Sequence, residues 1–231
     1  PMNVSQLMQR RLDVRNSDAK VKTSYMDNYF DTGDAVVYHP DGRVKIVLDS
    51  QTLRDMTPES QRSNGALVLT NEVYDTLQGE EFKKGKFGKT ESPLSREDVK
   101  AHPVWKVLAR DQALLNDYTD LIFAEGKERF NYDTAMGVYP DSAGDVPKMR
   151  AWIVGRLEDR SGALGSDDLV GDGGRLLGIA PEALSAPGKG ASNIKAYTMA
   201  DLQAVDKAMK GLEGTLHPDV LKPFQELRKK L

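Results

Sequence analysis

The most regular hydrophobic pattern in the chain lies between Pro103 and Glu125. Its apolar residues recur at spacings of three and four, which is typical of one face of an α-helix, and charged residues fill most positions between them. These apolar residues are Val104, Val107, Leu108, Leu115, Tyr118, Leu121 and Ile122. The pattern predicts a long helix near 103–125. A short helix from Ser95 to Ala101 should precede it, because Pro103 cannot continue a helix without a kink or break.

Three later segments repeat the helical spacing: 145–157, 198–212, and a last one that begins at Pro218 or at Pro223 and ends at Leu231. Their apolar residues are Met149, Trp152, Ile153 and Leu157; Leu202, Val205, Met209 and Leu212; and Phe224, Leu227 and Leu231. Helices that each carry one apolar face pack against one another, so the long helix is predicted to organise a helical bundle over 95–231.

The clearest β pattern lies near the start of the chain. Two β-branched runs flank the turn sequence Pro40-Asp41-Gly42, which predicts a hairpin from Ala35 to Leu48. Residues 66–70 have the composition of a third strand, and Asn3 is a candidate cap for a short helix before the hairpin. The predicted fold class is α+β and predominantly α. It comprises a small α+β unit over 1–80, a glycine- and lysine-rich linker over 81–94, and the helical bundle domain over 95–231.

Composition narrows the possible functions. The chain has 231 residues, 39% hydrophobic and 29% charged, and no cysteine, which excludes disulfides, a thiolate nucleophile and cysteine-ligated metals. The formal net charge of −3 provides no global basic field for nucleic acid or anionic lipid. No run approaches the ~18–20 apolar residues of a membrane span, and the first residues lack the apolar core of a signal peptide. We expect a soluble, cytoplasmic protein without a membrane partner.

A basic and aromatic stretch lies at residues 82–89. Its lysines could follow a phosphate backbone while its rings stack on unpaired bases of a single-stranded nucleic acid. The candidate residues are Phe82, Lys83, Lys84, Lys86, Phe87 and Lys89. The alternative interpretation is a solvated linker that its lysines keep open.

An acidic, glycine-rich loop from Ser161 to Gly174 contains Asp167, Asp168 and Asp172. Carboxylate oxygens in such a loop could bind Ca²⁺ or Mg²⁺ and support a metal-assisted hydrolase. The residue order of an EF-hand is absent, and the alternative interpretation is a solvated loop whose aspartates cap turns.

The histidines are His39, His102 and His217, and each directly precedes a proline. No two of them have the spacing of a metal-binding helix motif, so turn and cap roles are expected. For acid–base chemistry, His39 beside Asp41 and His102 beside Asp98 are the first candidates. The stretch 188–192 lacks the order of a phosphate-binding loop, and no cofactor is predicted.

An aromatic loop containing Phe130, Tyr132 and Tyr139 follows the long helix. Together with the amphipathic helices, it supports the leading hypothesis of a non-enzymatic binding protein whose partner is another protein. The alternatives are single-stranded nucleic-acid binding through 82–89 and a metal-assisted hydrolase that uses the acidic loop 167–172.

Overall fold

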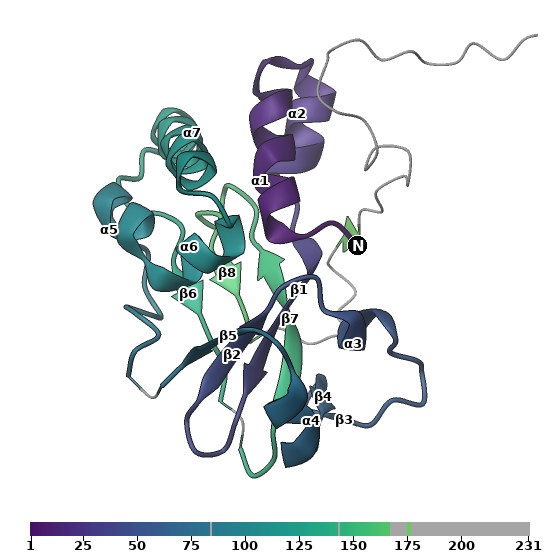
Figure 1. Cartoon of the computed structure of the whole chain (residues 1–231). Helices are drawn as coiled ribbons and strands as arrows, with labels where there is room; N and C mark the ends of the chain where they lie inside the picture. Colours follow the sequence, from purple (N-terminus) through teal and green to yellow (C-terminus); the bar gives the residue numbers. More distant parts are fainter. Residues whose placement is uncertain (84, 143, 167–174, 177–231) are drawn as a thin grey trace, which may run out of the picture. The chain divides into compact units, whose positions relative to one another are not determined.

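Two strands that lie far apart in the sequence form the centre of a large sheet. In the computed structural model, β1 (Phe30–Tyr38) pairs antiparallel with β7 (Lys148–Val154), as Figure 1 shows. The structure describes residues 1–83, 85–142, 144–166 and 175–176. The chain divides into two units, Pro1–Leu184 and Ser185–Leu231, and every described residue belongs to the first.

The strand order is β3-β4-β7-β1-β2-β5. The other strands are β2 (Val44–Val47), β3 (Arg62–Ser63), β4 (Ala66–Val68), β5 (Glu80–Phe82), β6 (Val138–Tyr139), β8 (Ala163–Leu164) and β9 (Arg175–Leu176). Strand β8 pairs with β6 and β7, and β9 pairs with β1. The pairing is antiparallel except between β6 and β8 and between β1 and β9.

Helices pack on both faces of this sheet. They are α1 (Val4–Asp13), the 3-10 turn η1 (Val14–Asn16), α2 (Ala19–Met26), α3 (Gln51–Arg54), α4 (Asn71–Thr76), α5 (Arg96–Ala101), α6 (Pro103–Ala109) and α7 (Gln112–Phe130). Side chains alternate along β1, so Val36 and Ala35 lie in different buried clusters. The larger cluster joins one face of the sheet to α1, α5, α6 and α7, and the smaller joins the other face to α3, α4 and β4.

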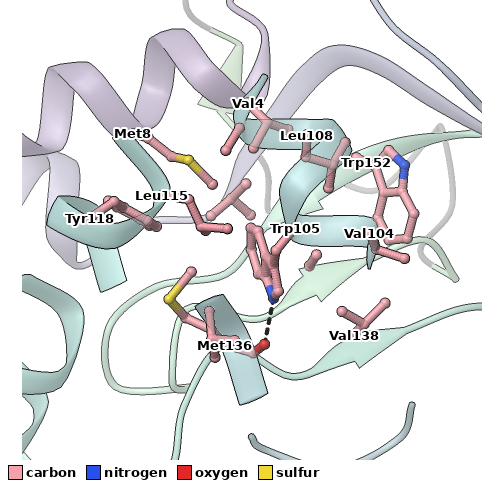
Figure 2. Packing of buried hydrophobic residues seen from close by; sticks show 14 of the residues in the cluster. Val4, Met8, Val104, Trp105, Leu108, Leu115, Tyr118, Met136, Val138 and Trp152 are labelled. Carbon is pink, nitrogen blue, oxygen red and sulfur yellow. Dashed lines mark hydrogen bonds between the residues drawn. The ribbon is translucent and has the colours of Figure 1, made fainter. Parts of the chain in front are cut away.

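Trp105 of α6 is a central residue of the larger cluster. Figure 2 shows Val104 and Leu108 beside Trp152 of β7, while Trp105 extends toward Met136. The indole N–H of Trp105 donates a hydrogen bond to the Met136 carbonyl at 2.6 Å. This bond satisfies the buried N–H and fixes the orientation of the ring.

The predicted helix over 145–157 is wrong, because residues 148–154 form the central strand β7. Every residue of β7 is buried, so the polar alternation that marks a half-exposed strand is missing. Met149 and Trp152 have helical spacing in the sequence, yet they belong to different buried clusters on opposite faces.

The predicted fold class is wrong for the same reason. The described part of the chain is a mainly antiparallel sheet with helices on both faces, not a predominantly helical bundle behind a small β unit. The predicted helices at 198–212 and 218–231 lie outside the described residues.

Several local predictions are confirmed. The hairpin is present as β1 and β2, with Ala35 paired to Val47, and β4 lies in the predicted third strand. Asn3 caps α1 in a capping box, and α5 ends at His102 before Pro103 begins α6.

The long helix predicted from Pro103 is instead two helices. Arg110 has φ +64°, a left-handed conformation that ends α6, and the Asp111 carboxylate then caps α7 by accepting a hydrogen bond from the Leu114 N–H at 2.7 Å. Helix α7 also continues to Phe130, past the predicted end at Glu125.

Asp34 binds the side chain of Arg110, the residue at which α6 ends. Its fully buried carboxylate accepts hydrogen bonds from the N–H groups of Val4 and Asp49, both at 2.9 Å. Arg110 donates to Asp34 at 2.8 Å and to the Asp49 carboxylate at 2.6 Å. Burial raises the pKa of Asp34, and the bonds from Asp49, Val4 and Arg110 oppose that rise. Asp34 therefore joins α1, the turn after β2 and the junction of α6 with α7.

We predict that Asp34→Ala lowers the free energy of unfolding by about 3–5 kcal/mol, because it leaves the N–H groups of Val4 and Asp49 without their acceptor and leaves Arg110 with the Asp49 carboxylate alone. Urea unfolding of the full chain measures this loss. Asp117 is an exposed aspartate of α7, and Asp117→Ala should change stability by no more than about 0.5 kcal/mol. Equal effects of the two substitutions would contradict the role given to Asp34.

We also predict that Leu115→Ala costs about 2–5 kcal/mol, because Leu115 is fully buried in the larger cluster. Val73→Ala removes an apolar side chain that is 38% exposed in α4 and should cost about 0.5 kcal/mol or less. Thermal or urea unfolding of both variants measures the contrast. A near-neutral Leu115→Ala would show that α7 does not depend on this contact.

Candidate partner-binding site

The end of α7 brings two aromatic rings together. Asn131 has φ +52° and ends the helix, which places the flanking residues Phe130 and Tyr132 on the same side of the turn. Their rings are parallel within 4°, with centroids 6.1 Å apart. Tyr132 is buried, whereas Phe130 remains 38% exposed. A partly exposed ring supported by a fixed neighbour is a common element of protein–protein contacts.

Tyr132 is held from several sides. Its hydroxyl donates a hydrogen bond to the Leu157 carbonyl at 2.8 Å, and burial raises the pKa of Tyr132 to about 12. The ring packs against Gly126 of α7, where a Cβ would overlap it. A glycine inside this helix is therefore required by the close approach of Tyr132.

A hollow of about 280 Å³ lies beside this ring, between α5 and the last turns of α7. The hollow is lined by Ser95, Arg96, Glu97, Phe123, Lys127, Tyr132 and Asp133. The rings of Phe123 and Tyr132 are buried, whereas Arg96, Glu97, Lys127 and Asp133 are charged. We call this feature the aromatic hollow, and with Phe130 it forms the candidate site.

Guanidinium groups lie over the rings of this site. The Arg96 guanidinium is 5.4 Å from the centre of the Phe123 ring, that of Arg129 is 5.1 Å from Phe130, and that of Arg160 is 4.8 Å from Tyr132. Cation–π contacts of this kind contribute roughly 0.5–1 kcal/mol at exposed positions. They hold the rings and guanidinium groups in defined positions.

The charges around the hollow have both signs. Lys127 and Asp133 form an ion pair at 3.0 Å in which both side chains are largely exposed, and Arg96 lies 3.5 Å from Asp120. Exposed ion pairs contribute little to the free energy of unfolding. Their side chains can therefore leave each other and pair with a ligand at a small cost in free energy. The arrangement suits an apolar side chain of a partner with polar or charged groups around it.

The third predicted aromatic residue, Tyr139, does not line the hollow. It lies in β6, half-buried, and its ring contacts the backbone at Gly137 and Gly162. The structure therefore brings together Phe130 and Tyr132 and leaves Tyr139 in the sheet. Phe123 and Arg96 were not predicted as site residues, because they come from α7 and α5 and no local motif marks them. In the sequence, Gly126 could have indicated a close contact at this position, because it is a glycine inside a helical pattern.

The basic and aromatic stretch does not present its rings to solvent. Phe82 and Phe87 are buried and meet edge to face at 5.3 Å, and Phe87 also stacks on Trp152 at 6.2 Å. Their side chains therefore form part of the core and cannot stack on bases. The lysines Lys83, Lys86 and Lys89 are exposed, and Lys84 lies outside the described residues.

His102 ties this stretch to the helices. Its Nε2 lies 2.9 Å from the Lys89 carbonyl, while its Nδ1 accepts a hydrogen bond from the Val104 N–H at 3.3 Å. These partners require the neutral imidazole with its proton on Nε2. Burial lowers the pKa of His102. This histidine is therefore a helix cap and a clamp on the loop.

The other candidate chemistry has a structural explanation or lies outside the described residues. His39 Nδ1 lies 2.8 Å from the Asp41 carboxylate, and its Nε2 lies 3.1 Å from the side chain of Asn71 in α4. Asp167, Asp168, Asp172, His217 and the stretch 188–192 lie outside the described residues. Among the residues that the structure describes, no cluster of His, Asp or Glu could hold a metal ion.

In the described part of the chain, no helix is long and apolar enough to cross a membrane.

Comparison with known proteins identifies the class of fold. The chain is similar to a solved structure described as "Accommodation of massive sequence variation in Nanoarchaeota by the C-type lectin fold". The TM-score is 0.51 and the sequence identity is 14%, over 72% of this chain and 81% of that chain. At this identity the similarity concerns the fold alone. No protein-family model matches the chain, and no curated protein sequence matches it.

We predict that the stability of the chain falls between pH 7.5 and pH 5, partly through His102. The unfolded-state pKa of histidine is about 6.5. Because the pKa of His102 is lower in the folded state, folding favours the neutral ring. The free energy of unfolding therefore decreases as the pH falls below the pKa of the unfolded histidine. His102→Asn keeps a capping acceptor and cannot titrate, so urea unfolding should show a shallower pH dependence. Parallel profiles for the two proteins would contradict the clamp.

Proposed function

We propose that this chain is a binding protein that recognises a segment of another protein through the aromatic hollow and Phe130. The observation that carries the proposal is the exposure of Phe130 against the fixed ring of Tyr132. Aromatic and arginine side chains dominate the energetics of protein interfaces, and the site contains both. The C-type lectin fold is compatible with this role and does not specify it.

The chemistry of the hollow defines the kind of partner. Phe123 and Tyr132 form an apolar floor that accepts an apolar or aromatic side chain, and burial of such a side chain supplies roughly 1.5–3 kcal/mol. Lys127 and Asp133 can pair with charges of either sign around it. We therefore expect a peptide segment with one apolar anchor between polar residues.

The other hypotheses are less well supported. Nucleic-acid binding through residues 82–89 lacks stacking rings, because Phe82 and Phe87 are buried. The metal-assisted hydrolase stays a prediction, since its aspartates lie outside the described residues. The cytoplasmic location also stays a prediction from the sequence.

The test is a selection of peptides from a displayed random library on the full chain. We expect the selected peptides to share an apolar anchor and to lose about 30-fold or more in affinity with Phe130→Ala, which corresponds to an interface hot spot of about 2 kcal/mol. Fluorescence anisotropy of labelled peptides measures the dissociation constants.

Two further variants make the result specific. Val146 is another exposed apolar residue, and Val146→Ala should leave peptide affinity within about twofold. Gly126→Ala displaces the Tyr132 ring without touching Phe130 and should also weaken binding. Peptides that bind all variants equally well would refute the aromatic hollow as the site.

A further inference from the structure

The sheet ends at β5, a short strand with one open edge in the described part of the chain. Figure 1 shows β5 at the margin of the sheet beside β2, and no described strand pairs with its other side. Glu80, Glu81 and the following Lys83 are exposed. The open edge of a sheet is a template on which a further strand can pair.

Backbone hydrogen bonds in β2 alternate between its two neighbouring strands. At the hairpin turn the His39 N–H donates to the Arg43 carbonyl at 2.9 Å, so these two residues form a hydrogen-bonded pair. Bonded and non-bonded pairs alternate in an antiparallel ladder, so the pair of Val37 with Lys45 is bonded as well. The backbone of Lys45 therefore faces β1, and the residues on either side of it face β5.

The outward backbone groups of β5 belong to Glu81. Val44 and Ile46, the residues of β2 that face β5, lie opposite Phe82 and Glu80 in the register. Phe82 and Glu80 thus direct their backbone groups toward β2. Glu81 lies between them and directs its N–H and C=O toward the open edge, where a strand of another chain can bond to them.

The sequence of this edge is complementary to itself in charge. Residues 80–84 read Glu-Glu-Phe-Lys-Lys, so reversal of the strand direction exchanges glutamates for lysines about Phe82. When β5 pairs antiparallel with β5 of a second copy, with Phe82 opposite Phe82, Glu81 of each copy lies opposite Lys83 of the other. Opposite charges at such positions stabilise a pair of strands, and like charges destabilise it.

The charges also select this register over its neighbours. Because only every second residue directs its backbone outward, neighbouring registers differ by two residues. One of them places Glu81 opposite Glu81 and the other places Lys83 opposite Lys83, and both arrangements bring like charges together. Lysines on an edge strand commonly oppose pairing with another chain, but in the central register each Lys83 meets a glutamate.

The carboxylate of Glu81 is already oriented for this contact. Its Oε2 accepts hydrogen bonds from the Tyr74 hydroxyl at 3.3 Å and from the Arg43 guanidinium at 3.4 Å, which leaves Oε1 for a further cation. Side chains alternate along a strand, so Lys83 lies on the same face as Glu81, and Phe82 lies on the other face within the larger cluster.

A hollow of about 570 Å³ lies beside the start of β5 and can extend the contact. Leu48, Val107 and Lys106 are among the residues that line it. Leu48 is an apolar residue that is 36% exposed. In an antiparallel pair the chain of the second copy leaves β5 at this end, where it can cover Leu48.

We propose that two copies of this chain associate through antiparallel pairing of their β5 strands about a two-fold axis at Phe82, with Glu81 of each copy opposite Lys83 of the other. This surface is separate from the aromatic hollow, which lies between α5 and α7, so the proposal does not depend on peptide binding. Interfaces with a small contact area are weak. We therefore expect a dissociation constant between about 1 μM and 1 mM.

The test is sedimentation equilibrium of the full chain over that range of concentration. The mean mass should rise with concentration from the 25.5 kDa of one chain toward twice that value. Lys83→Glu places like charges opposite each other at both symmetric positions and should weaken association at least about 10-fold. Lys89→Glu makes the same change of charge at an exposed lysine outside the paired residues and should leave association unchanged.

A mixture of two variants tests the register itself. Glu81→Lys alone should associate as poorly as Lys83→Glu alone, because lysines then lie opposite lysines. An equimolar mixture of the two should form a heterodimer with about the affinity of the parent chain, because each glutamate again meets a lysine. If Glu81→Lys does not fold, the contrast between Lys83→Glu and Lys89→Glu decides.

The proposal is overturned if the parent chain keeps the mass of one copy over the whole range, which is also the result expected if another part of the same chain covers this edge. It is overturned as well if Lys83→Glu and Lys89→Glu associate equally, or if the mixed variants stay separate. Phe130→Ala should associate like the parent chain, so the outcome is independent of the aromatic hollow.

Discussion

The carboxylate of Asp34 accepts hydrogen bonds from the first turn of α1 and from the backbone of Asp49, and it binds the guanidinium of Arg110. Arg110 adopts a left-handed conformation between α6 and α7, and its side chain reaches both carboxylates from that position. The direction of α7 depends on this turn, and the positions of Phe123 and Tyr132 depend in turn on α7. One buried carboxylate within β1 is thereby linked to the geometry of a surface site at the far end of α7.

The sequence predicts the elements whose chemistry is local. A turn made by proline and glycine, a capping asparagine and a proline that breaks a helix each act through their nearest neighbours, and the hairpin, α1 and the boundary at His102 are present. Strand β7 was not predicted because both of its faces are buried. Its sequence therefore lacks the alternation of apolar and polar residues that distinguishes a strand from a helix. The turn at Arg110 was not predicted, and the carboxylate that its side chain binds lies 76 residues earlier in the chain.

In the candidate site, too, residues that are close in the sequence were predicted and residues that come from distant segments were not. Phe130 and Tyr132 are close in sequence and were predicted, whereas Phe123 and Arg96 reach the hollow from other turns and helices. Composition alone could not distinguish the exposed ring of Phe130 from the buried rings of Phe82 and Phe87. Exposure is decided by which strand or helix covers a ring, and that is a property of the tertiary fold.

The pairing of β1 with β7 has a consequence for how the chain is made. Tyr38 pairs with Lys148, so about 110 residues must be synthesised before the centre of the sheet can close, which takes roughly 5–20 s at the usual rates of translation. During that time the edge of β1 that pairs with β7 lacks that partner, and the unpaired backbone groups of such an edge can pair with another chain. Sheet closure over such a sequence distance is also slow, because the loop entropy is lost before the contacts form. The nascent chain is thus most vulnerable to aggregation before β7 emerges from the ribosome.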